Sequence, residues 1–181
     1  MTTFAKCLAA ACLTFSIAPA VAHTADARDQ FFATLKSMCG QKFEGAMTYP
    51  LDPKHDFAGK RLAAHVATCT ETEVRVPFQV GEDRSRTWVF TKGKGGLELR
   101  HDHRHADGTP DAVTMYGGLA TTTGSGSAQS FKADDYTAKL INGAVTNVWT
   151  VSMNSDGSEL TYHLERDAKP RVTAVLKRLA P

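Results

Sequence analysis

The chain contains, at residues 86–105, the stretch RTWVFTKGKGGLELRHDHRH. In its second half, residues 97–105, the odd positions are leucine or histidine and the even positions are charged. Successive side chains of a β-strand point to opposite faces, so this alternation separates an apolar and imidazole face from a charged one. The glycines of residues 93–96 provide a turn between the two halves. The stretch therefore predicts an antiparallel hairpin whose odd-numbered face is buried and whose even-numbered face, including Asp102, meets solvent.

The rest of the chain repeats this pattern of short strands and turns. Clusters of Gly, Pro, Asn and Asp separate the stretches of alternating residues. Two segments, 26–38 and 134–141, have helical spacing or helix boundary signals instead. The segment 117–127, rich in Gly and Thr, is expected to be a loop. About ten strands are expected, at residues 43–49, 61–69, 73–80, 86–92, 97–105, 112–116, 128–131, 145–153, 159–165 and 172–179.

These elements predict a mostly β fold. An antiparallel meander of about ten strands exposes two edges unless the sheet closes on itself. Closure gives an up-and-down, lipocalin-like barrel, here with an N-terminal helix and one short internal helix, and this is the architecture that we expect. A two-sheet β-sandwich is the alternative, because strand number and spacing do not separate the two folds.

Residues 1–22 have the features of an export signal. Lys6 precedes an apolar run, and Pro19 is followed by small residues up to Ala22, where a signal peptidase would cut. The apolar run, residues 7–17, is shorter than the roughly 20 residues that span a bilayer, and no comparable run follows. We expect a periplasmic or secreted protein with no membrane span, in which residues 23–181 form a single domain.

Removal of the signal leaves Cys39 and Cys69 as the remaining cysteines. An exported chain meets an oxidising compartment, so these two residues are expected to form a disulfide. Loss of Lys6 lowers the formal net charge from +2 to +1. A net charge this close to zero does not indicate a surface that binds nucleic acid.

Three strings of residues resemble a family of uncharacterised secreted bacterial proteins: DRSRTW at 83–88, HDHRHADG at 101–108 and MYGG at 115–118. The family has no established reaction, so the resemblance implies export and a fold rather than a function. The string GQKFEG at 40–45 is similar to the Gly-x-Trp start of the first strand in lipocalin and nitrobindin-type barrels, with Phe43 as the aromatic residue. This second resemblance implies a calycin-like barrel.

The alternation places His101, His103 and His105 on the inward face near one end of the barrel. Alternate residues of a strand lie about 6.5 to 7 Å apart, so neighbouring imidazoles on one face could converge on Zn, Cu or Ni. Such a site would indicate a metal-binding protein or a metal-dependent enzyme. The alternative is a metal-free polar pocket, with the imidazoles bonded to backbone or to Asp83 and Asp111.

Arg84 and Arg86 would share a face with Trp88 if the strand extends through them. A pair of arginines above an aromatic face could bind a carboxylate or phosphate at the barrel mouth. The alternative is that Trp88 belongs to the core and the arginines pair with Glu82 or Asp83, as arginines near local acids usually do.

The leading functional hypothesis is an exported barrel that binds a small apolar or amphipathic molecule. The chain lacks a Gly-x-Ser-x-Gly elbow and an HExxH motif, so the sequence does not favour an enzyme, and it implies no cofactor apart from the divalent metal considered above. A structural or interaction protein without a ligand is the alternative, and an unfilled interior would distinguish the two. The expected ligand-binding residues are His101, His103, Arg84, Arg86, Trp88 and Tyr116.

Overall fold

A computed structural model of the chain describes residues 1–2, 26–50 and 52–180. The expected signal peptide lies, after its first two residues, outside the described part, so its cleavage stays a prediction. None of the described helices is long and apolar enough to cross a membrane. The elements are α1 Ala27–Ser37, β1 Lys42–Tyr49, β2 Leu62–His65, β3 Thr68–Cys69, β4 Glu73–Val80, β5 Asp83–Gly93, β6 Gly96–His103, β7 Tyr116–Ser125, β8 Ala128–Lys132, α2 Asp135–Leu140, the 3-10 helix η1 Ala144–Thr146, β9 Val148–Met153, β10 Glu159–Arg166 and β11 Lys169–Arg178.

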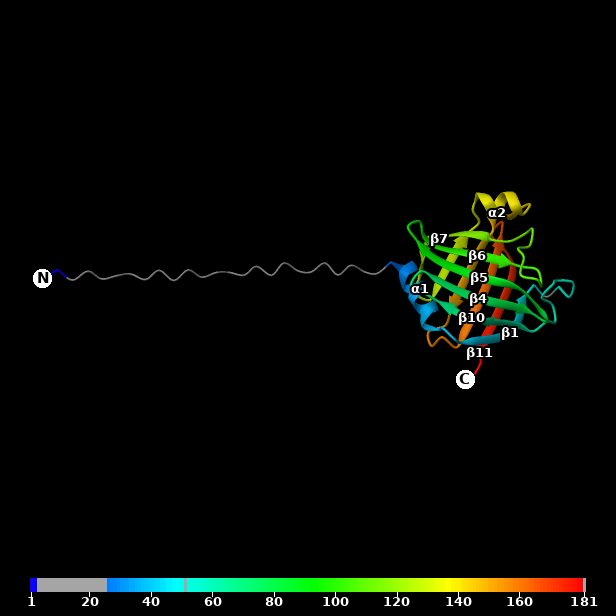
Figure 1. The fold of residues 1–181 in the computed structure, drawn as a ribbon, viewed down its shortest axis with the longest axis horizontal. Helices are drawn as coiled ribbons and strands as arrows, with labels where there is room; N and C mark the ends of the chain where they lie inside the picture. The colour runs from blue at the N-terminus through cyan, green and yellow to red at the C-terminus, as the bar shows by residue number, and fades with distance from the viewer. Residues whose placement is uncertain (3–25, 51, 181) are drawn as a thin grey trace.

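The strands form a closed antiparallel barrel of ten strands (Figure 1). From β4 to β11 each strand pairs with the next, and β11 pairs with β1. The short strand β2 closes the ring, because it pairs with β1 on one side and with β4 on the other. Strand β3 pairs with β4 on the same side as β2, at the other end of β4. This closure confirms the up-and-down barrel and excludes the sandwich.

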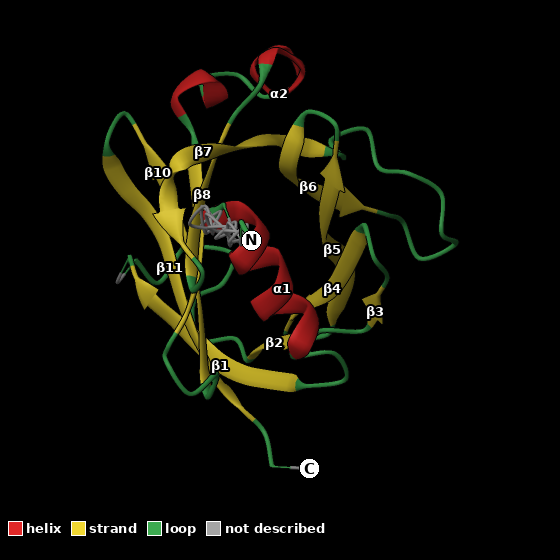
Figure 2. Cartoon of the chain, turned by 90° about the vertical axis from the view of Figure 1, so that its left-hand side faces the viewer, coloured by secondary structure: helices red, strands yellow, loops and turns green. Residues whose placement is uncertain are grey.

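Helix α1 lies across one end of the barrel, inside the ring of strands (Figure 2). Asp26 begins the helix, because its side chain accepts a hydrogen bond from the Arg28 backbone N–H. Phe31, Phe32 and Leu35 recur at helical spacing and are buried against the strands. The Phe31 ring lies 6.1 Å from that of Phe90 in the barrel interior. Helix α1 therefore fills this end of the core.

The predicted disulfide is confirmed. Cys39, just after α1, is bonded to Cys69 in β3, 30 residues further along the chain. The bond ties the helix that fills the barrel end to the strands around it.

The structure corrects the prediction for the segment around Tyr116. Residues 112–116 were expected to be a strand and 117–127 a loop, but β7 begins at Tyr116 and runs to Ser125. Its glycines allow close approach of neighbouring backbones, since a Cβ on Gly117 would lie 1.9 Å from the Leu99 carbonyl oxygen. The residues before β7 form hydrogen bonds outside any ladder, as when the Thr114 hydroxyl accepts from the His103 N–H.

Candidate functional site

A hollow of about 330 Å³ lies at the end of the barrel opposite α1. At this end the chain makes its long connections, from β1 to β2 and from β6 to β7, which Figure 1 shows on the right. We call this hollow the mouth pocket, and the residues that define it are Arg86, His103, Tyr116, Trp149, Tyr162 and Arg166. Its volume is at the lower end of the range of roughly 300 to 1,000 Å³ that is usual for ligand pockets.

Two rings that stack across the barrel separate the mouth pocket from the core. The ring centres of Trp88 in β5 and Tyr162 in β10 are 4.9 Å apart, and the Phe78 ring stacks against Trp88 at 4.6 Å and lies 6.3 Å from Tyr162. Trp88 is 2 % exposed and lies beneath the pocket, whereas Tyr162 forms part of the pocket wall. Trp88 therefore packs beneath the pocket floor.

A β-bulge separates the two arginines that the alternation placed together. Phe78 pairs with Arg86 and Val80 with Asp83, so three steps along β5 match two steps along β4. One extra residue reverses the side to which the preceding residues point. The bulge therefore turns Arg84 to the other face, whereas Arg86 lines the mouth pocket, where its guanidinium is bonded to Asp83.

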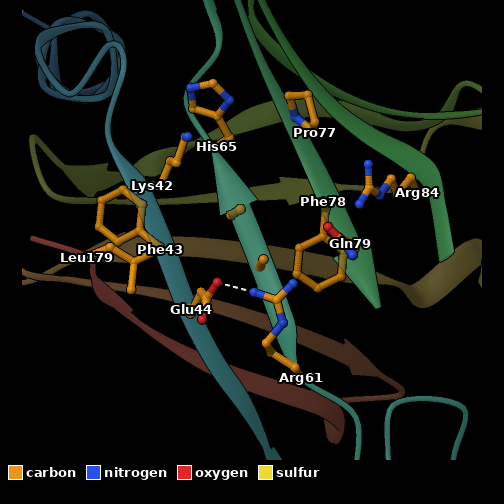
Figure 3. Close-up of a pocket in the computed structure, with 12 residues that line it drawn as sticks. Lys42, Phe43, Glu44, Arg61, His65, Pro77, Phe78, Gln79, Arg84 and Leu179 are labelled. Carbon is orange, nitrogen blue, oxygen red and sulfur yellow. Dashed lines mark hydrogen bonds and ion pairs between the residues drawn. The ribbon is translucent and has the colours of Figure 1, made fainter. Parts of the chain in front are cut away.

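Arg84 is exposed and lies on the outer face of the barrel (Figure 3). It borders a hollow of about 410 Å³ over Ala63, where β2 closes the ring. An ion pair between Arg61 and Glu44 lies on the same side of the sheet. The structure therefore does not bring Arg84 to the other expected ligand-binding residues.

His101 is buried beneath the mouth pocket with both ring nitrogens bonded. Nδ1 lies 3.2 Å from the Tyr116 carbonyl oxygen and Nε2 lies 3.1 Å from the Tyr162 hydroxyl. A carbonyl only accepts, so Nδ1 carries the proton and the Tyr162 hydroxyl donates to Nε2. Burial lowers the pKa of His101 from 6.5 to about 3. The imidazole is therefore neutral and fixed in one tautomer.

His103 is the histidine of this strand that reaches the pocket. Its Nε2 lies 3.0 Å from the Tyr116 hydroxyl. Burial, and then the positive charge of Arg86, lower the pKa of His103, while nearby acids including Asp111 oppose this shift. Burial also raises the pKa of Tyr116 to about 12. At neutral pH this part of the wall consists of uncharged hydrogen-bonding groups.

The three histidines do not converge. Strand β6 ends at His103, and His105 lies in the following turn, where it is exposed and its N–H donates to the Thr109 carbonyl. Alternation ends with the strand, so His105 is not on the inner face. Within the ranges that the structure describes, no group of three or more His, Cys, Asp or Glu side chains is arranged to hold a metal ion.

Asp102 also differs from the prediction, because it is only 3 % exposed although it points outward. Two arginines cover it on the outer face: Arg75 Nη2 lies 2.9 Å and Arg104 Nε 3.1 Å from its carboxylate. Long side chains on neighbouring strands can bury a residue that alternation assigns to solvent.

Arg166 was not among the predicted site residues. It ends β10 on the wall opposite Arg86, and its Nε donates to Asn147 Oδ1 at 2.8 Å. Asn147 is 3 % exposed and is itself fixed by backbone hydrogen bonds to Ala133 and Ala144. No sequence motif marks this pair, since the two residues lie 19 positions apart, one after η1 and the other at the end of β10.

The β1–β2 connection supplies a further wall that sequence reasoning missed. Phe57 lies 5.8 Å from Phe78, and the Arg86 guanidinium carbon lies 5.9 Å from the centre of the Phe57 ring. His55 Nδ1 accepts from the Phe57 N–H at 3.1 Å. In the sequence, Asp56 and Gly59 indicate a turn, but nothing indicates that the Phe57 ring between them borders a pocket.

The structure thus places Arg86, His103 and Tyr116 in the mouth pocket and His101 and Trp88 directly beneath it. The closed antiparallel fold is compatible with a lipocalin-like barrel. In a comparison with known proteins, the chain matches no protein-family model and no curated protein.

Proposed function

We propose that this chain is an exported protein that binds a small, partly apolar molecule in the mouth pocket. The observation that carries the proposal is the contrast between the two halves of the barrel. Large buried side chains such as Phe31, Phe90 and Phe131 fill the half next to α1, whereas a hollow of about 330 Å³ is left at the other end. A protein that used its barrel only as a scaffold would have no need of that hollow.

The composition of the wall supports the same proposal. Trp149, Tyr162, Leu164 and Val172 give one side an aromatic and aliphatic surface, and polar groups gather at the rim. Ligand pockets typically combine an apolar wall with a few fixed polar groups of this kind. Trp149 and Tyr162 are almost fully buried and lie in strands, so their side chains lose little conformational freedom when a ligand binds.

Export is part of the proposal. The disulfide between Cys39 and Cys69 fits an oxidising compartment. A ligand-binding barrel outside the cytoplasm would capture its ligand from the periplasm or the medium.

The test is a panel of small ring compounds, both neutral and charged, titrated into the mature protein and observed through backbone amide NMR shifts. We expect shifts at Tyr116, Trp149 and Leu164. In Leu164→Trp the indole fills the hollow and these shifts should vanish. Leu119→Trp is the matched control, because Leu119 is 48 % exposed outside the pocket. If no compound moves the pocket amides, or if Leu164→Trp binds as wild type does, the proposal is wrong.

A further inference from the structure

We infer that the ligand is a small aromatic monocarboxylate and that Arg166 binds its carboxylate. The inference rests on the proposed function, because it concerns the same pocket. It names a residue that determines specificity and the chemical class that this residue selects.

Arg166 has hydrogen-bonding capacity left over. Its Nε is bonded to Asn147, and no carboxylate among the described residues forms an ion pair with its guanidinium. The two terminal nitrogens present parallel N–H groups that match the two oxygens of a carboxylate. Asn147 restrains the guanidinium, so these two parallel N–H groups are held in place before a ligand binds.

The charges around the pocket favour one negative charge on the ligand. Arg86 is already paired with Asp83, and Asp56 is an exposed acid at the rim. The pKa shifts of His101 and His103 keep both imidazoles uncharged at neutral pH. Arg166 is therefore the arginine of the pocket lining that has no carboxylate partner among the described residues, and one such cation matches a carboxylate better than a phosphate monoester, which carries about −1.5 to −2.

The pocket floor determines which end of the ligand lies deepest. The Tyr162 hydroxyl proton is committed to His101, as derived above, so Tyr162 offers an approaching carboxylate only oxygen lone pairs. Trp149 and Tyr162, with the aliphatic side chains of Leu164 and Val172, instead provide an apolar lining for an aromatic ring. The ligand would therefore bind with its ring on the floor and its carboxylate at the Arg166 side of the rim.

The experiment compares benzoate with benzamide, which has nearly the same shape but no charge. Calorimetric titrations use the mature protein as wild type, Arg166→Gln, Arg166→Lys and Arg84→Gln. Wild type should bind benzoate roughly tenfold or more tightly than benzamide, the size expected for a charge-assisted bidentate contact. Inorganic phosphate should compete poorly with benzoate.

Arg166→Gln should bind benzoate no more tightly than benzamide, and the benzamide binding that it retains shows that the variant is folded. Arg166→Lys keeps the positive charge but lacks the two parallel N–H groups, so it should retain part of the preference for benzoate over benzamide. Arg84→Gln, on the outer face, should behave as wild type. Equal binding of benzoate and benzamide by wild type, or an intact preference in Arg166→Gln, would overturn this inference while leaving the proposed function standing. Absence of binding by both probes and by the ring-compound panel would count against the proposed function itself.

Discussion

Trp88 and Tyr162 lie face to face across the barrel, with ring centres 4.9 Å apart and ring planes at 6° to each other. The two residues come from β5 and β10, which lie on opposite sides of the ring of strands. Their contact spans the interior, so it divides the filled half of the barrel from the mouth pocket. The stack is therefore both part of the core and the floor of the proposed binding site.

Truncation of this stack should cost much of the protein's stability. Trp88→Ala removes a ring that is 2 % exposed, and we expect a loss of about 3 to 5 kcal/mol in the free energy of unfolding. The control is Tyr136→Ala, because Tyr136 is 49 % exposed, and the expected loss is about 1 kcal/mol or less. Urea denaturation followed by circular dichroism measures both. Similar losses for the two variants would show that the stack does not stabilise the fold as described.

The buried His101 should make stability depend on pH. Burial lowers its pKa in the folded protein from 6.5 to about 3, so between these values the unfolded chain binds a proton that the folded protein does not. Stability therefore falls as pH decreases below about 6.5, by about 1.4 kcal/mol per pH unit for one such group. Burial gives His103 a shift in the same direction.

The test compares unfolding free energies at pH 7 and pH 5 for wild type, His101→Gln and His105→Gln. His101→Gln should lose less stability between the two pH values than wild type, by about 1 to 2 kcal/mol. His105→Gln replaces an exposed imidazole and should follow wild type. Parallel pH profiles for wild type and His101→Gln would mean that His101 titrates normally in the folded protein.

Ligand binding should also depend on pH, through His103. An anion in the pocket adds negative charge near His103 and raises its pKa, so binding is accompanied by proton uptake and strengthens as pH falls. The charges that act on His103 are those of Arg86, Asp111, Asp83 and Asp102, the last from the outer face, and its titratable neighbours inside the barrel are Tyr116 and the neutral His101. Benzoate titrations at pH 7.5 and 5.5 in wild type and His103→Gln test this, since the variant should lose the pH dependence. Affinity that weakens at low pH would indicate a ligand that competes with protons, such as a metal ion.

Strand alternation predicted the inner face of β6 well. Leu97, Leu99 and His101 are buried as expected, because a strand of a closed barrel has one face inside. The alternation failed where the strand ended, at His105, and where long side chains from neighbouring strands covered Asp102. Neither effect is local to the strand, so neither could be predicted from it.

The candidate site could be predicted only in part, for a physical reason. Arg86, His103 and Tyr116 come from strands whose positions follow from the meander, and they do meet at the mouth pocket. The bulge that moves Arg84 outward is one extra residue in β5, and no residue type marks it. Arg166 is brought to the pocket by the β10–β11 turn on the far side of the barrel, a relationship that exists only after closure.

The alternation itself can be tested on neighbouring residues of β6. Leu99 is fully buried, so Leu99→Asp places a charge in the core and should cost roughly 3 kcal/mol or more. Glu98→Lys changes a partly exposed residue on the outer face and should cost several times less, although it removes an ion pair with Arg100. Denaturant melts of the two variants provide the comparison, and equal losses would contradict the assignment of faces.

The measurement that bears most directly on ligand binding is native mass spectrometry of the protein isolated, without unfolding, from its natural host. We predict that the polypeptide begins at His23, carries the Cys39–Cys69 disulfide and retains a small organic molecule. The same adduct should be present on Leu119→Trp and absent from Leu164→Trp. A native mass equal to that of the polypeptide alone, or an adduct that persists in Leu164→Trp, would contradict the proposal that the mouth pocket is a ligand-binding site.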